Sequence, residues 1–189
     1  MGADVKARAV ILMTLLVAAC AAPERVAASR PANAQEEGRV KVDEVAAIIL
    51  RDVHPLYGGQ VIYLAADGGG YCQLVSRLPG VTALAEKRYP LAVPAEAMAR
   101  LRRLAAAHAA APPPSSSAPG LPDAAKPRIA VRLASGRSVD VSRWQREQNA
   151  EFDELYQALL AVAQAATAQK PQSQGRFEPE WVPDGFRGR

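Results

Sequence analysis

The chain has 189 residues, which is enough for one ordinary domain with tails. Hydrophobic residues make up 49%, much of it alanine, and aromatic residues only 5%, so the core is expected to be small. A net charge of +4 is well short of that of a nucleic-acid-binding arm. Two cysteines with no CxxC motif or Cys/His cluster exclude a disulfide framework and a zinc site. We therefore expect no nucleic acid, no metal and no other cofactor.

The N-terminus has the layout of an export signal. Lys6 and Arg8 precede an apolar run over residues 9–19, which is too short to span a bilayer comfortably. The run ends in Val17-Ala18-Ala19-Cys20, which resembles the bacterial lipobox. The resemblance implies a bacterial lipoprotein: a signal peptide over residues 1–19 is removed, and lipid on Cys20, palmitate included, holds the mature chain to a membrane.

Other interpretations of this segment stay open. A plain secretory signal would be cut after Ala22 and would still export the protein, and a cytoplasmic protein with an N-terminal helix is the remaining alternative. Ala21 stands where many Gram-negative inner-membrane lipoproteins have aspartate, so the resemblance implies the outer membrane or the cell surface. Residues 20–39 are rich in alanine, proline and charge, and we expect the lipidated cysteine to be followed by a flexible tether there.

A single α+β domain is expected over residues 40–166. Residues 44–53 favour a strand, although a short helix capped by Asp43 is an alternative because short apolar runs are ambiguous. Residues 85–93 predict another strand, which Pro90 confines to an edge position.

Between these two strands the sequence predicts a hairpin. Residues 60–66 and 71–77 flank the turn signal Asp67-Gly68-Gly69-Gly70. The register stays open at this point. A loop with an odd number of residues puts one set of side chains on a single face, and an even number separates them: Ile62, Leu64, Cys72 and Leu74.

A helix is predicted after Pro94, which suits the first helical position. Met98, Leu101 and Leu104 repeat at helical spacing, and the helix is expected to end within residues 109–114. His108 is expected to face solvent or the C-terminal dipole of this helix. A Pro/Ser-rich loop follows at residues 112–120.

The clearest hairpin joins residues 128–134 to residues 138–142 through Ser135-Gly136. Its first strand puts Arg128 and Arg132 on one face and the aliphatic set Ile129, Val131 and Leu133 on the other. Asn149 is expected to cap a second helix, whose apolar stripe consists of Phe152, Leu155, Leu159 and Val162. Residues 167–189 predict an extended C-terminal tail that drapes over the domain or stays loose.

These elements predict an antiparallel sheet with two helices packed on one face, in the order strands, helix, two strands, helix. Over about residues 44–162 this order resembles a loose family of uncharacterised bacterial domains. The matching pieces are the Asp67-Gly68 hairpin, Tyr89-Pro90-Leu91, Pro122-Asp123, Gly136 with Val139, and Trp144 ahead of Phe152-Asp153. The resemblance implies the fold and no activity.

Candidate chemical groups are few. Asp52 and His54 would share a strand face, where a carboxylate beside an imidazole can bind metal or relay protons, but no third group is evident. The glycines after Asp67 lack the lysine and the following helix of a phosphate cradle, so a hairpin turn is the better interpretation. Cys72 has no activating cation beside it and is expected to be a buried small residue.

A basic face is the remaining candidate, although arginines on a solvent face are the ordinary explanation of such a pattern. Its members would be Arg128, Arg132, Arg137, Arg143, Arg146 and the neighbouring Trp144. We therefore expect a lipid-anchored, non-enzymatic interaction module of the cell envelope that binds an envelope protein or an anionic polymer. The alternative is an envelope hydrolase that uses Asp52, His54 or Asp67.

Overall fold

The computed structural model describes residues 41–78, 80, 83–117, 119, 124–144 and 146–187. The expected signal peptide, Cys20 and the tether lie outside these residues, as do Pro122 and Asp123.

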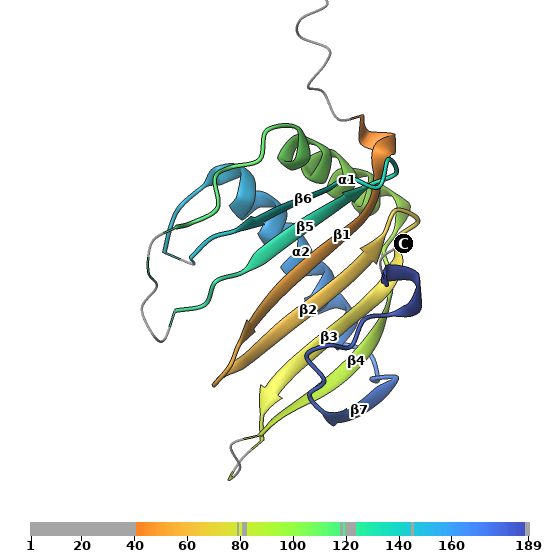
Figure 1. Cartoon of the computed structure of the whole chain (residues 1–189). Helices are drawn as coiled ribbons and strands as arrows, with labels where there is room; N and C mark the ends of the chain where they lie inside the picture. The colour runs from red at the N-terminus through yellow and green to blue at the C-terminus, as the bar shows by residue number, and fades with distance from the viewer. Residues whose placement is uncertain are drawn as a thin grey trace, which may run out of the picture. The chain divides into compact units, whose positions relative to one another are not determined.

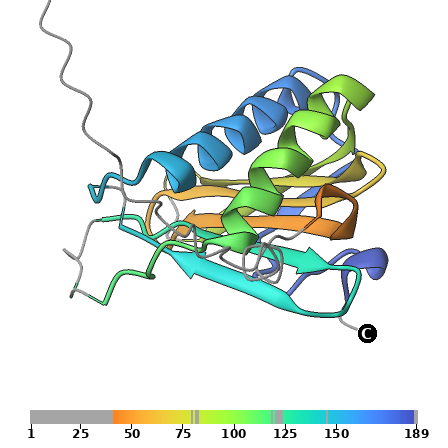
Figure 2. The same ribbon diagram turned by 90° about the horizontal axis from the view of Figure 1, so that it is seen from above.

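Seven antiparallel strands form one sheet in the order β6-β5-β1-β2-β3-β4-β7 (Figure 1). Their bounds are Val45–His54 (β1), Gly58–Ala65 (β2), Gly69–Arg77 (β3), Leu84–Ala92 (β4), Arg128–Leu133 (β5), Ser138–Ser142 (β6) and Ser173–Arg176 (β7). Two helices, α1 (Ala95–Ala110) and α2 (Ala150–Thr167), lie side by side on one face of this sheet (Figure 2). Short 3-10 turns occupy Val42–Glu44 and Asp184–Phe186. The predicted α+β architecture is therefore confirmed.

β1 lies inside the sheet and pairs with β2 on one side and β5 on the other. Its side chains are buried on both faces, since Ile48 and Leu50 pack under the helices and Ile49 packs on the opposite face. A strand covered on both faces has a continuous apolar sequence, which explains why periodicity alone left a helix open here. The strand interpretation of residues 44–53 is confirmed.

The turn between β2 and β3 decides the register that the sequence left open. Three residues, 66–68, separate the two strands, and Ile62 pairs directly with Cys72. Gly68 has a φ of +88°, and a Cβ there would lie 2.7 Å from the carbonyl oxygen of Val93, so the turn requires glycine. Because directly paired residues share a face, the apolar side chains of the hairpin lie together under the helices.

Pro90 sits at a local edge of the sheet, as predicted. β4 pairs with β3 along its whole length, but β7 covers only Ala85–Arg88. The proline therefore lies past the last β7 pair, where its missing N–H costs no ladder bond.

The main core lies between the sheet and the two helices. Asn149 caps α2 by accepting a hydrogen bond from the Phe152 N–H at 2.8 Å, as predicted. The buried residues that α2 contributes to this core are Phe152, Leu155, Leu159, Ala163 and Ala166. His108 lies in the last turn of α1, but it does not face solvent: the residue is 1% exposed, and its ring centre lies 6.1 Å from that of Phe152 because α1 turns this face toward α2.

A smaller apolar cluster lies on the opposite face of the sheet, which we call the tail face. Residues 177–187, which we call the strap, follow β7 and cross this face (Figures 1 and 2). Phe186 and the half-buried Trp181 and Val182 of the strap pack on Ile49 and Tyr63 of the sheet. The C-terminal segment thus supplies a seventh strand and the cover of the second face.

Candidate functional site

The structure places Asp52 and His54 in separate local arrangements. Asp52 lies under α2 and accepts a hydrogen bond from the Tyr156 hydroxyl at 2.6 Å. His54 accepts the Leu56 backbone N–H at Nδ1, 3.1 Å away, and stacks on the Tyr57 ring. Each group is therefore engaged by its own neighbour rather than by the other.

Asp67 lies at the far end of the same strand pair. Its Oδ1 accepts the Gly69 N–H at 2.9 Å, which stabilises the hairpin turn. Asp52 lies opposite Gln60, and Asp67 follows the end of β2 at Ala65. The strand from Gln60 to Ala65 is about 17 Å long, so Asp67 is far from Asp52. Among the residues that the structure describes, no three His, Cys, Asp or Glu side chains gather to hold a metal ion.

Arg143 and Trp144 hold the proline-rich loop beside β6. Arg143 donates to the Pro114 carbonyl oxygen at 2.9 Å, and the Lys126 ammonium lies 5.0 Å from the Trp144 ring. Of the arginines expected to form a basic face, Arg128 and Arg132 lie on the tail face, while Arg143 makes this separate contact.

The tail face carries a basic cavity of about 390 Å³ beside the strap, which we call the basic pocket. Its lining residues are Ile49, Arg51, Tyr63, Arg128, Ala130, Arg132, Ser138, Asp140 and Val182. Arg128 is neutralised by Asp140, whose Oδ1 accepts from Nε at 2.6 Å. Arg51 and Arg132 form no ion pair with any residue that the structure describes. The charged side chains that line the pocket, three arginines and one aspartate, therefore sum to +2.

Both of these arginines are oriented by neutral oxygen atoms. Arg51 donates to the Tyr63 hydroxyl at 2.9 Å and to the Pro179 carbonyl at 3.2 Å, and Arg132 donates to the Phe186 carbonyl at 2.6 Å. Burial raises the pKa of Tyr63 against the opposing effect of the arginines, so its hydroxyl stays protonated and donates to the Trp181 carbonyl at 2.9 Å.

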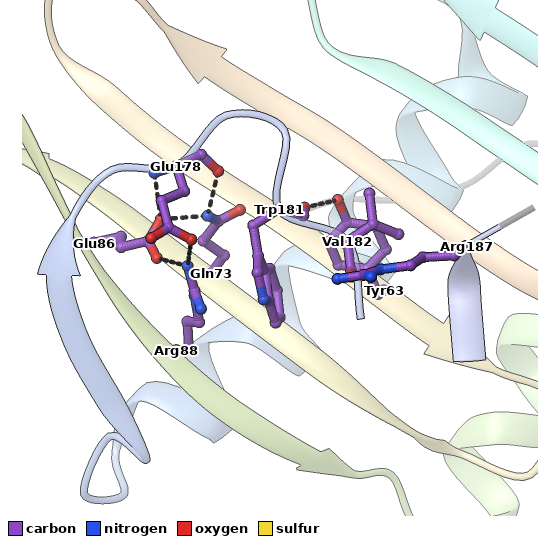
Figure 3. Close-up of polar contacts among 8 residues, drawn as sticks. All are labelled: Tyr63, Gln73, Glu86, Arg88, Glu178, Trp181, Val182 and Arg187. Carbon is purple, nitrogen blue, oxygen red and sulfur yellow. Dashed lines mark hydrogen bonds and ion pairs between the residues drawn. The ribbon is translucent and has the colours of Figure 1, made fainter. Parts of the chain in front are cut away.

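A second polar group on the tail face anchors the start of the strap (Figure 3). The Glu86 carboxylate is 4% exposed and accepts hydrogen bonds from Gln73 and from the Glu178 N–H, the latter at 2.9 Å. It also pairs with Arg88, which reaches the Glu178 carboxylate at 2.6 Å. The Arg88 guanidinium lies 4.2 Å from the centre of the Trp181 ring.

Sequence reasoning missed most of this site. Gln73 and the Glu86-Lys87-Arg88 stretch lie at strand positions that would face water if helices covered only the other face of the sheet, so neither stood out. A usable signal was the tail itself, because Phe177, Trp181 and Phe186 need apolar surface to cover.

Comparisons of the chain with protein-family models, with curated proteins and with solved structures found no match. Within the described residues, no helix combines the length and the apolar character needed to cross a membrane.

The thiol of Cys72 is expected to be inert in the folded protein. Cys72 is fully buried under the helices, and burial raises its pKa to about 11 from a usual value of 9.0. In a Cys20→Ala variant, Cys72 is the one thiol left. Labelling by a thiol reagent should accelerate at least about 100-fold on denaturation, because the thiolate is the reactive form and the raised pKa makes it about 100-fold rarer in the folded protein. Equal rates for folded and denatured protein would contradict this expectation.

His108 is expected to make the fold less stable below neutral pH. Burial lowers its pKa below the usual 6.5, against the opposing charge of Glu151. As the pH falls below about 6.5 the unfolded chain takes up a proton first, so stability should be flat above that pH and fall below it.

The matched variant is His108→Leu. Neither ring nitrogen has a hydrogen-bond partner in the described part of the chain, so the leucine variant should be more stable by about 1 kcal/mol at pH 7. The difference in unfolding free energy between the two proteins should widen from pH 7 to pH 5 in urea titrations. A constant difference would show that His108 does not titrate.

Proposed function

We propose that the chain is a non-enzymatic binding module that recognises an acidic partner protein with the tail face of its sheet. The observation that carries the proposal is the pair of guanidinium groups, Arg51 and Arg132, which lie in one cavity and form no ion pair with any residue that the structure describes. Guanidinium groups present paired N–H donors that match carboxylates. The apolar walls of the pocket, such as Ile49 and Val182, reduce the screening of this attraction by water.

The compartment is part of the same proposal. The lipobox-like Val17-Ala18-Ala19-Cys20 supports export and anchoring by lipid on Cys20, at the outer membrane or the cell surface. A domain tethered there meets its partners within the envelope, so we infer an envelope protein with an exposed acidic segment as the partner. Asp52, His54 and Asp67 support the hydrolase alternative less well, because each has its own hydrogen-bond arrangement.

Binding of a labelled polyglutamate probe to the full chain in detergent tests this function by fluorescence anisotropy. We expect binding that weakens as salt is raised toward about 0.15 M, because the attraction is between exposed charges. Arg132→Gln should weaken binding about tenfold, since one charge-assisted contact is worth about 1.4 kcal/mol. The variant also loses the Arg132 donor to the Phe186 carbonyl, so circular dichroism is used to check that it stays folded.

Arg137→Gln is the matched control. It makes the same change of charge on the exposed turn between β5 and β6, and Arg137 does not line the pocket. Equal losses in the Arg132 and Arg137 variants would contradict a defined site. Binding of polyphosphate in preference to polyglutamate would point to an anionic polymer and contradict an acidic protein partner.

A further inference from the structure

Side chains of the sheet hold the strap mainly through hydrogen bonds to the main-chain atoms of the strap. Glu86 accepts the Glu178 N–H, and Gln73 donates to the carbonyl oxygen of the same residue at 3.3 Å. Further along the strap, Tyr63, Arg51 and Arg132 each donate to a main-chain carbonyl, at 2.9, 3.2 and 2.6 Å. Contacts to main-chain atoms do not depend on the side chains of the bound segment, so other extended segments can make them.

Side-chain selectivity comes from the position that Trp181 occupies. Its ring meets those of Tyr63 and Tyr71 edge to face, with centres 5.8 and 5.7 Å away. It also lies beside the Arg88 guanidinium (Figure 3). Aromatic pairs of this geometry and a guanidinium over an indole are each favourable. The tail face therefore has a defined place for one tryptophan.

The strap also has the charge that the tail face attracts. Its three acidic residues, Glu178, Glu180 and Asp184, outnumber its one basic residue, Arg187. Glu178 pairs with Arg88 of the sheet, whereas Asp184 pairs with Arg187 within the strap. The basic pocket beside Val182 adds Arg51 and Arg132, which form no ion pair with any residue that the structure describes. An acidic segment thus fits this face better than a neutral one.

The strap fills its groove incompletely. Cavities of about 390, 450 and 610 Å³ border it, and strap residues between Trp181 and Arg187 line each of them. Most strap side chains are exposed, with Phe186 and Pro183 the buried ones among the described residues. A segment with larger side chains would bury more of this surface than the strap does.

We propose that the tail face is a peptide-binding groove, that the strap is its intramolecular occupant, and that an acidic, tryptophan-containing segment of a partner protein replaces the strap. This inference rests on the proposed binding function and names the class of partner. The strap competes as part of the same chain, at an effective concentration of about 1 mM, so the partner binds tightly only when the strap is loosened.

A labelled peptide with the sequence of residues 177–187 tests the groove. The Trp181→Ala variant of the full chain loosens the strap and should bind this peptide at least about tenfold more tightly than the wild type, whose groove is occupied. The matched control is Trp144→Ala, which removes the other tryptophan of the chain, beside Lys126, and should bind as weakly as the wild type. A peptide with alanine in place of its tryptophan should bind about tenfold more weakly to the Trp181→Ala variant.

Absence of peptide binding by a folded Trp181→Ala variant, or equal binding of the two peptides, would overturn the inference. Circular dichroism establishes folding, and Phe186→Ala replaces Trp181→Ala if the latter does not fold. If the peptide does not bind but polyglutamate binding still depends on Arg132, this inference is contradicted and the proposed function is not. If the peptide binds but Arg132→Gln does not weaken polyglutamate binding, the role of the basic pocket is contradicted and the peptide-binding groove is supported.

Discussion

Replacing Glu86 with alanine is expected to lower the free energy of unfolding by about 3 kcal/mol, because it breaks a buried charged cluster. The substitution removes the acceptor of the Gln73 side chain and of the Glu178 N–H, and one of the two carboxylates that pair with Arg88. Buried donors without an acceptor have lost their hydrogen bonds to water and form none in the protein, which destabilises the folded state. Urea titrations followed by circular dichroism measure the change, and a red shift of tryptophan emission should accompany release of Trp181.

Glu154→Ala is the matched control for this variant. Glu154 pairs with Arg100 at 3.4 Å, and both side chains are more than half exposed. Exposed pairs contribute little, so this variant should stay within about 0.5 kcal/mol of the wild type. Equal stability losses in the two glutamate variants would show that the cluster under the strap does not stabilise the fold.

Replacing Cys20 with alanine is expected to abolish incorporation of labelled palmitate and to move the protein from the membrane fraction to the soluble fraction. The expectation rests on the charged start, the apolar run over residues 9–19 and the lipobox-like ending. Several acyl chains anchor a protein stably whereas none leaves it soluble, so the effect on localisation should be close to complete.

Cys72→Ala controls for palmitate on the other cysteine. Cys72 is buried beneath the helices and should carry no lipid, so this variant should label as the wild type does. Palmitate labelling that persists in Cys20→Ala would contradict the lipobox interpretation. Labelling lost in both variants would contradict the assignment of the lipid to Cys20 alone.

Local patterns were sufficient for most element types, but they left residues 44–53 open between strand and helix and did not predict β7. The alternation in Arg128–Leu133 and the Asn149 cap follow from contacts within a few residues, and both are confirmed. The helical stripe of α2 was equally visible, since residues three and four apart lie on one face of a helix. The burial of His108 was missed because it depends on α2, which begins more than 40 residues later in the chain.

The sequence by itself determined the class of the fold, both helices, the strands other than β1 and β7, and the face of β5 that packs under the helices. Only the tertiary structure decided the hairpin register, the burial of Glu86 and the position of the strap. The physical reason is separation along the chain: Arg51 meets Pro179 across 128 residues, and Glu178 meets Glu86 across 92. The periodicity of a sequence depends on neighbours two to four residues away. Contacts between distant residues exist only in the folded chain, in which the seven strands are paired and the strap lies on the tail face of the sheet.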